Sequence, residues 1–160
     1  MNIRIQYLII LVSQSICFPY NANYVTTANI ATIIPVIDGV VIDDPAWESS
    51  IEINQFTQKS PNEGEMVTEK TIVKVMFSND ILYISAVCYD NNPEKIVITD
   101  TRRDAPLLNT DSFMFILDTF QDQQNGYVFG TNAGGIEYDA QVSKGGEGMS
   151  INTRRQSVGI

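Results

Sequence analysis

Residues 110–142 read TDSFMFILDTFQDQQNGYVFGTNAGGIEYDAQV, and this stretch predicts three short β-strands joined by two turns. From Phe113 to Asp118 the side chains alternate with a period of two, which places neighbours on opposite faces of a sheet. Asn125-Gly126 is a pair that readily takes the positive φ angles of a tight hairpin turn, and residues 132–135 supply a second turn. The sequence therefore predicts an antiparallel meander at the centre of the fold.

The rest of the chain repeats this pattern of strands and turns. Further strands are expected at residues 35–39, 51–58, 70–77, 81–89 and 95–99, and the two longest should form a hairpin. Asp44 suits a helix N-cap and Pro45 the first helical position, so a short helical turn should begin there and direct Trp47 inward. With about eight strands and no amphipathic helix, the predicted fold class is all-β, an antiparallel, jelly-roll-like β-sandwich that is incomplete at its C-terminus.

Residues 1–22 have the layout of a secretory signal peptide. Arg4 precedes an apolar run at residues 7–12, and small or polar residues follow. The run is too short to span a bilayer, which needs roughly 20 apolar residues. We expect export to the periplasm, the outer membrane or the extracellular space. A lipid anchor on Cys17 and an uncleaved anchor helix are the alternatives.

Residues 23–142 then form the predicted sandwich domain, and residues 143–160 a flexible or truncated tail. The strand pattern ends at Val142, and a glycine-rich run from Lys144 to Gly148 follows it. Domains rarely end on an exposed strand edge followed by such a tail. We therefore expect the chain to be the N-terminal part of a longer protein.

The composition argues against two classes of function. Acidic residues outnumber basic residues by 19 to 10, which is the opposite of the clustered Lys and Arg that nucleic-acid binding requires. The chain has 0 histidines, which excludes nucleophile activation by histidine and zinc sites that use it. Cys88, the cysteine that remains after removal of the signal, is expected on the inner face of a strand as a small apolar side chain.

Several short motifs spread over residues 35–142 occur together in one known family. They are Ile37-Asp38-Gly39, Asp44-Pro45-Ala46-Trp47, Leu82-Tyr83-Ile84, Tyr89-Asp90, Asp111-Ser112-Phe113, Leu117-Asp118-Thr119 and Gly126-Tyr127-Val128-Phe129. This combination resembles the family 9 carbohydrate-binding module. Three more motifs narrow the resemblance to the N-terminal domain of long bacterial outer-membrane-associated proteins of undefined function, namely Asn62-Glu63-Gly64, Arg102-Arg103-Asp104 and Gly130-Thr131-Asn132.

The resemblance implies a β-sandwich that binds a poly- or oligosaccharide without a cofactor and is associated with polysaccharide-degrading enzymes. Some family members hold structural calcium, and an outer-membrane barrel or another partner domain would follow downstream. Characterised members clamp the sugar between two tryptophans. This sequence has Trp47 alone, in a segment that the family uses for packing.

Five residues are the predicted carbohydrate-binding set. Sugar sites combine aromatic faces with a few fixed polar groups in a concave surface. Arg102, Arg103 and Asp104 lie in a predicted loop, and Tyr127 and Asn132 lie on the neighbouring hairpin. The alternative interpretation is a solvated charged loop or a structural salt bridge, with Tyr127 used in packing and Asn132 in a turn.

Carboxylates support two further interpretations. Asp118, Asp122 and Asn125 place three oxygen ligands in one turn, which suits calcium, although their spacing is not that of an EF-hand. Paired carboxylates such as Asp111 and Glu137 could also hydrolyse a glycoside. We assign no metal site and expect a non-catalytic carbohydrate-binding-module-like domain of an exported cell-envelope protein. The alternative is a structural or interaction domain that packs against the rest of a longer outer-membrane protein.

Overall fold

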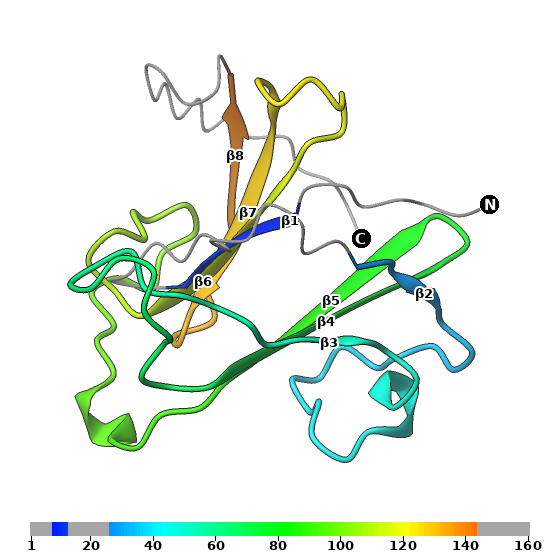
Figure 1. Cartoon of the computed structure of the whole chain (residues 1–160), viewed down its shortest axis with the longest axis horizontal. Helices are drawn as coiled ribbons and strands as arrows, with labels where there is room; N and C mark the ends of the chain where they lie inside the picture. Colours follow the sequence, from blue (N-terminus) through cyan, green and yellow to red (C-terminus); the bar gives the residue numbers. More distant parts are fainter. Residues whose placement is uncertain (1–7, 13–25, 144–160) are drawn as a thin grey trace.

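The computed structural model describes residues 8–12 and 26–143, and in these ranges the regular secondary structure is β-strand apart from two short 3₁₀ turns. The strands form two sheets, which confirms the predicted all-β sandwich (Figure 1). The first sheet contains, in spatial order, β1 (Leu8–Val12), β6 (Ser112–Leu117), β7 (Gly126–Asn132) and β8 (Tyr138–Val142). The second contains β2 (Asn29–Ile30), β3 (Glu52–Ile53), β4 (Thr71–Ser78) and β5 (Ile81–Cys88).

The predicted meander is confirmed as β6, β7 and β8, which pair antiparallel in chain order. The first turn differs from the prediction, because Gln121 and Gln123, rather than Asn125-Gly126, take positive φ angles. The loop is wide, and the carboxylate of Asp118 accepts hydrogen bonds from its backbone amides. Gly126 is needed for a different reason: a Cβ there would lie 2.6 Å from the carbonyl oxygen of Leu117 on β6.

The predicted hairpin is also confirmed, since β4 and β5 pair antiparallel from Thr71↔Cys88 to Ser78↔Ile81. The opposite edge of β4 is shared, with β3 paired antiparallel at Val73 and β2 paired parallel at Met76. The strands are antiparallel as predicted, except that β2 pairs parallel with β4. Cys88 shares the inner face of Leu82, Ile84 and Ala86 by the alternation of β5, as expected, but at the end of the strand it is exposed rather than buried.

Two predicted strands are absent from the described residues. Residues 35–39 form no strand, and Ile37 is 81% exposed, because no neighbouring edge receives their backbone hydrogen bonds. Residues 95–99 follow the 3₁₀ turn η2 (Pro93–Lys95), and the backbone of Val97 bonds to Thr110 and Asp111 instead of to a strand. The expected strand at residues 51–58 shortens to β3.

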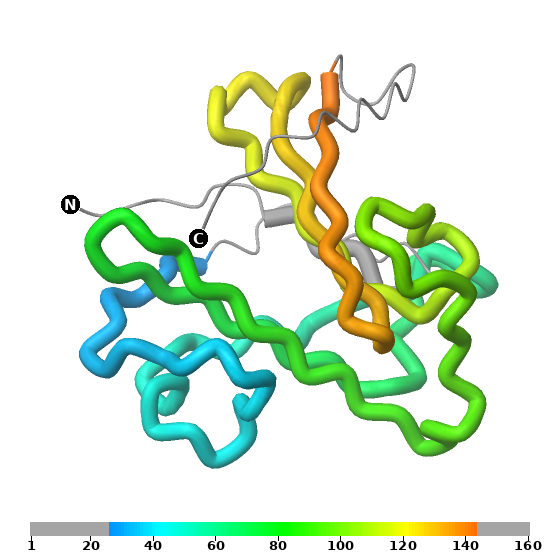
Figure 2. Tube along the Cα trace, turned by 180° about the vertical axis from the view of Figure 1, so that it is seen from behind, coloured from blue at the N-terminus to red at the C-terminus, as the bar shows by residue number. Residues whose placement is uncertain are grey.

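The inner core lies between the facing surfaces of the two sheets. Val73 and Val75 of β4 are buried there, and Phe113 and Phe115 of β6 pack against this cluster. Seen from behind, the β4–β5 hairpin crosses the meander, and the loop that leads into β6 lies beside β8 (Figure 2). Leu107 of that loop is buried with Ile136, which closes the other face of the first sheet.

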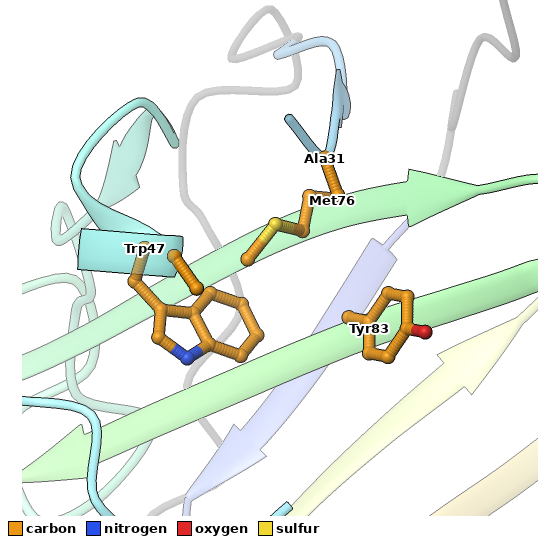
Figure 3. Packing of buried hydrophobic residues seen from close by; sticks show 5 residues of the cluster. Ala31, Trp47, Met76 and Tyr83 are labelled. Atoms are coloured by element: carbon orange, nitrogen blue, oxygen red, sulfur yellow. The ribbon is translucent and has the colours of Figure 1, made fainter. Parts of the chain in front are cut away.

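A second core lies on the outer face of the β4–β5 hairpin. The 3₁₀ turn η1 (Pro45–Trp47) is capped as predicted, because Asp44 Oδ1 accepts a hydrogen bond from the amide of Ala46 at 2.9 Å. Trp47 is only 3% exposed and packs in a cluster with Met76 and Tyr83 (Figure 3). The inward position predicted for Trp47 is confirmed.

The strand β1 falls inside the predicted signal peptide, residues 1–22. Its backbone pairs antiparallel with β6, from Leu8↔Leu117 to Val12↔Phe113. Residues 1–7 and 13–22 of the predicted signal peptide and residues 144–160 of the predicted tail lie outside the described residues. Removal of the predicted signal would leave the β6 edge without this strand.

Candidate functional site

Arg102 is fixed by one acidic neighbour that the sequence analysis did not single out. Its Nε lies 3.0 Å from Asp100 Oδ1 and its Nη2 lies 2.5 Å from Asp100 Oδ2, a bidentate pair. The hydrogen bonds from Arg102 hold the pKa of Asp100 well below its usual range, and the same pairing raises the pKa of Arg102. The Arg102 side chain is nevertheless 84% exposed, so its guanidinium faces solvent in a fixed orientation.

Arg103 contacts three carboxylates. Its Nη2 lies 2.9 Å from Asp139 Oδ1 and its Nε lies 3.7 Å from Asp104 Oδ2, while Nη1 donates to Glu137. The backbone amide of Asp104 also bonds to the carbonyl oxygen of Glu137, which ties this loop to the residues just before β8. Burial, together with the nearby charge of Asp104, raises the pKa of Tyr138.

Asn132 is buried, and its side chain forms hydrogen bonds with nearby backbone groups. Its Nδ2 donates to the carbonyl oxygen of Asp100 at 2.8 Å, and its Oδ1 accepts from the amide of Gly134 at 2.9 Å. This supports the turn interpretation of Asn132. The predicted loop and its partners form what we call the polar platform, which consists of Asp100, Arg102, Arg103, Asp104, Asn132, Glu137 and Asp139.

Tyr127 is not part of the polar platform. It lies near the start of β7, opposite Leu117, whereas Asn132 ends the same strand opposite Ser112. A strand rises about 3.3 Å per residue, so the two are separated by roughly 17 Å along β7. The structure therefore brings together four of the five predicted carbohydrate-binding residues and leaves Tyr127 at the other end of the strand.

The candidate calcium ligands form hydrogen bonds within the loop between β6 and β7. Asp118 Oδ2 accepts from the amide of Gln123 at 2.8 Å, and Asp122 Oδ1 accepts from the amide of Asn125 at 2.8 Å. Hydrogen bonds from Asn125 are the main cause of the lowered pKa of Asp122. Within residues 8–12 and 26–143, no group of three or more His, Cys, Asp or Glu side chains could hold a metal ion.

A second candidate site, which the sequence analysis missed, is a hollow of about 270 Å³ on the outer face of the second sheet. Its floor is built by the cross-strand pairs Ile72↔Val87 and Lys74↔Ser85 of the β4–β5 hairpin. This floor continues along the strands from the Met76↔Tyr83 pair that Trp47 covers (Figure 3). We call it the outer hollow, and its remaining lining residues are Val41, Ile42, Asp43, Asp44, Glu48, Glu52 and Tyr89.

The lining of the outer hollow is acidic. It holds the four carboxylates of Asp43, Asp44, Glu48 and Glu52 and the single ammonium of Lys74. The Lys74 Nζ lies 3.5 Å from Glu52 Oε1 and 3.3 Å from the carbonyl oxygen of Trp47. The sequence signal for this site was the acidic loop next to a capped turn, but only the β4–β5 register shows which strand residues lie beneath it.

The chain matches no family model, no curated protein and no solved structure. In the part of the chain that the structure describes, no helix is long and apolar enough to cross a bilayer. The two candidate sites are therefore the structural features from which a function can be proposed.

Proposed function

We propose that this chain is a non-catalytic carbohydrate-binding-module-like domain of an exported cell-envelope protein. In this proposal the polar platform supplies hydrogen bonds to the hydroxyl groups of a poly- or oligosaccharide. The β-sandwich supports the proposal because loops at the ends of such a scaffold commonly carry binding residues. The resemblance of the sequence to the family 9 module points in the same direction.

The observation that carries the proposal is the fixed, exposed guanidinium of Arg102. Asp100 occupies its Nε and Nη2 atoms, so the group is oriented before any ligand arrives. A donor that is already ordered loses less conformational entropy on binding. The planar fork of arginine also offers directional hydrogen bonds that a lysine would not reproduce.

A glycan array on the full chain tests this proposal, with Arg102→Lys as the informative variant and Lys95→Ala as the control. Lys95 is an exposed cation in η2 and is not one of the platform residues. We expect a bound glycan whose signal falls for Arg102→Lys and is unchanged for Lys95→Ala. Equal signals for all three proteins, or no bound glycan, would reject the platform as a sugar site.

One observation favours the alternative, a structural or interaction domain. Residues 33–42 expose a run of large apolar side chains, Ile33, Ile34, Val36, Ile37, Val40 and Ile42. Contiguous exposed apolar surface marks interaction sites. If this segment packs against the rest of a longer protein, its amides should exchange hydrogen more slowly there than in the chain alone. Equal exchange rates would argue against this alternative.

A further inference from the structure

We infer that the outer hollow binds the primary ammonium group of a small organic molecule. The inference concerns a different face of the molecule from the polar platform and does not depend on the proposed function. Ligand sites usually have volumes of about 300–1,000 Å³. A hollow of about 270 Å³ is therefore sized for one sugar ring or one long side chain.

The carboxylates that line the hollow determine which ligand charge it favours. Asp44 Oδ1 is occupied by the amide of Ala46, and Glu52 lies 3.5 Å from the Lys74 ammonium. Asp43 and Glu48 have no hydrogen bond or ion pair through their side chains to any described residue. Two carboxylates without a cation favour a positively charged ligand and disfavour an anion.

Lys74 does not take the place of this ligand. Its side chain is 18% exposed, and its Nζ is directed to Glu52 and to the carbonyl oxygen of Trp47. Lys70 is the other nearby cation, and its Nζ lies over the ring of Tyr89 at 5.5 Å from the ring centre. Counting both lysines, the acidic groups around the hollow still outnumber the basic ones.

Ser85 provides an independent indication of a ligand. It is 5% exposed, and its Oγ has no hydrogen-bond partner among the described residues. The alternation of β5 places Ser85 on the same face as Val87 and Tyr89, so its side chain is directed toward the hollow. Buried hydroxyl groups are normally paired, and a polar ligand group would supply the missing partner.

The remaining lining identifies an organic cation rather than a metal ion. Ile72 and Val87 present apolar surface beside the carboxylates, which suits the carbon skeleton of an amine. Among the described residues no three acidic side chains lie close enough together to hold a metal ion. The same ammonium chemistry could come from a free amino sugar or from a lysine side chain of a peptide.

Calorimetric titration of the full chain at pH 6 tests the inference and separates the two sources. The ligands are D-glucosamine, neutral D-glucose as its matched control, and 1,5-diaminopentane as a mimic of the lysine side chain. We expect at least one amine to bind about tenfold more tightly than glucose. Preference for glucosamine identifies an amino sugar, and preference for the diamine identifies a lysine-like group. Equal affinities for glucose and both amines, or no binding by any of them, would overturn the inference.

Substitutions in the lining test whether the amine binds in the outer hollow. Asp43→Asn keeps a residue that tolerates the positive φ of 61° at that position, and Glu48→Gln preserves side-chain shape. Each should weaken amine binding about threefold to fivefold, the range of a partly exposed ion pair. Ser85→Ala should weaken it as well, whereas Glu94→Gln, an exposed acid in η2, should not. Unchanged affinity in all three hollow variants would overturn the assignment, even if the amines bind.

Discussion

The polar platform and the outer hollow are both rich in carboxylates, but they differ in how those carboxylates are matched. On the platform, Arg102 and Arg103 face four acids, and each acid contacts one of the two guanidinium groups. In the outer hollow, a single lysine faces four acids and contacts only Glu52 among them. Every acid of the platform therefore contacts a guanidinium group, although Asp104 Oδ1 is buried without a hydrogen-bond partner among the described residues. In the hollow, Asp43 and Glu48 contact no cation of a described residue.

This difference shows why a count of charges does not locate a binding site. A matched cluster can present oriented donors, as Arg102 does, but its ion pairs also have a structural role. An unmatched cluster costs folding free energy through repulsion, and a bound cation would relieve that cost. Substitutions that alter one site at a time test whether the two sites are independent.

The largest effect is expected for Trp47→Ala, which removes the side chain that packs η1 onto the β4–β5 hairpin. Deleting a large buried aromatic side chain costs about 3–5 kcal/mol of unfolding free energy. Urea denaturation measures this loss. Because the residues that cap η1 form part of the wall of the outer hollow, we expect the affinity for amines to fall together with the unfolding free energy. The platform contacts, which involve the loop before β6 and the end of the first sheet, should be preserved below the unfolding transition.

Trp47→Phe is the matched control for this prediction, since it keeps an aromatic ring in the same cluster. Its unfolding free energy should lie between those of the wild type and Trp47→Ala. If Trp47→Ala is as stable as the wild type, Trp47 does not anchor the turn. The second core would then contribute little to the fold.

A smaller effect of opposite sign is expected for Ser85→Ala. The hydroxyl of Ser85 is buried without a partner among the described residues, so replacing it with a methyl group removes an unsatisfied polar atom. We expect the free chain to gain about 1 kcal/mol of unfolding free energy. Differential scanning calorimetry without ligand measures the gain. A clear loss of stability would mean that Ser85 has a structural partner, and the contrast between the two sites would weaken.

Arg103→Ala tests the matched site in the same way. The substitution leaves Glu137 and Asp139, which both contact Arg103, without their shared cation. Exposed ion pairs contribute little, so the loss of unfolding free energy should be about 0.5 kcal/mol. Arg103→Lys, which keeps the charge, should recover part of it in denaturation measured at low salt. Full retention of stability in Arg103→Ala at low salt would show that the platform is not held by its ion pairs.

The sequence predicted those parts of the fold that depend on local patterns. The β4–β5 hairpin and the meander follow from alternation, and the η1 cap follows from Asp44 and Pro45. Residues 35–39 alternate less clearly, and the structure pairs them with no strand. A strand needs a partner from elsewhere in the chain, and local composition does not reveal which edge is free.

The candidate sites show the same limit. The sequence was enough to choose Arg102 and Arg103 as candidates, because they lie in a charged loop. Their partners Asp100 and Glu137 are recognisable only in the folded structure. Glu137 lies 34 residues from Arg103 in the sequence. The outer hollow could not be predicted, because it requires the register that sets Lys74 opposite Ser85. Long-range register is therefore the information that sequence reasoning lacked.

The smallest and most selective effect is the pH dependence of the Asp100–Arg102 pair. Folding lowers the pKa of Asp100 from its ordinary value of 3.8, mainly through the hydrogen bonds from Arg102. A lowered pKa means that the pair stabilises the fold fully above about pH 4 and that this contribution is lost as the pH falls below that value. Melting curves of the wild type and Asp100→Asn should therefore differ near pH 6 and converge toward pH 2. Curves that stay equally far apart at both pH values would show that Asp100 acts through something other than its charge.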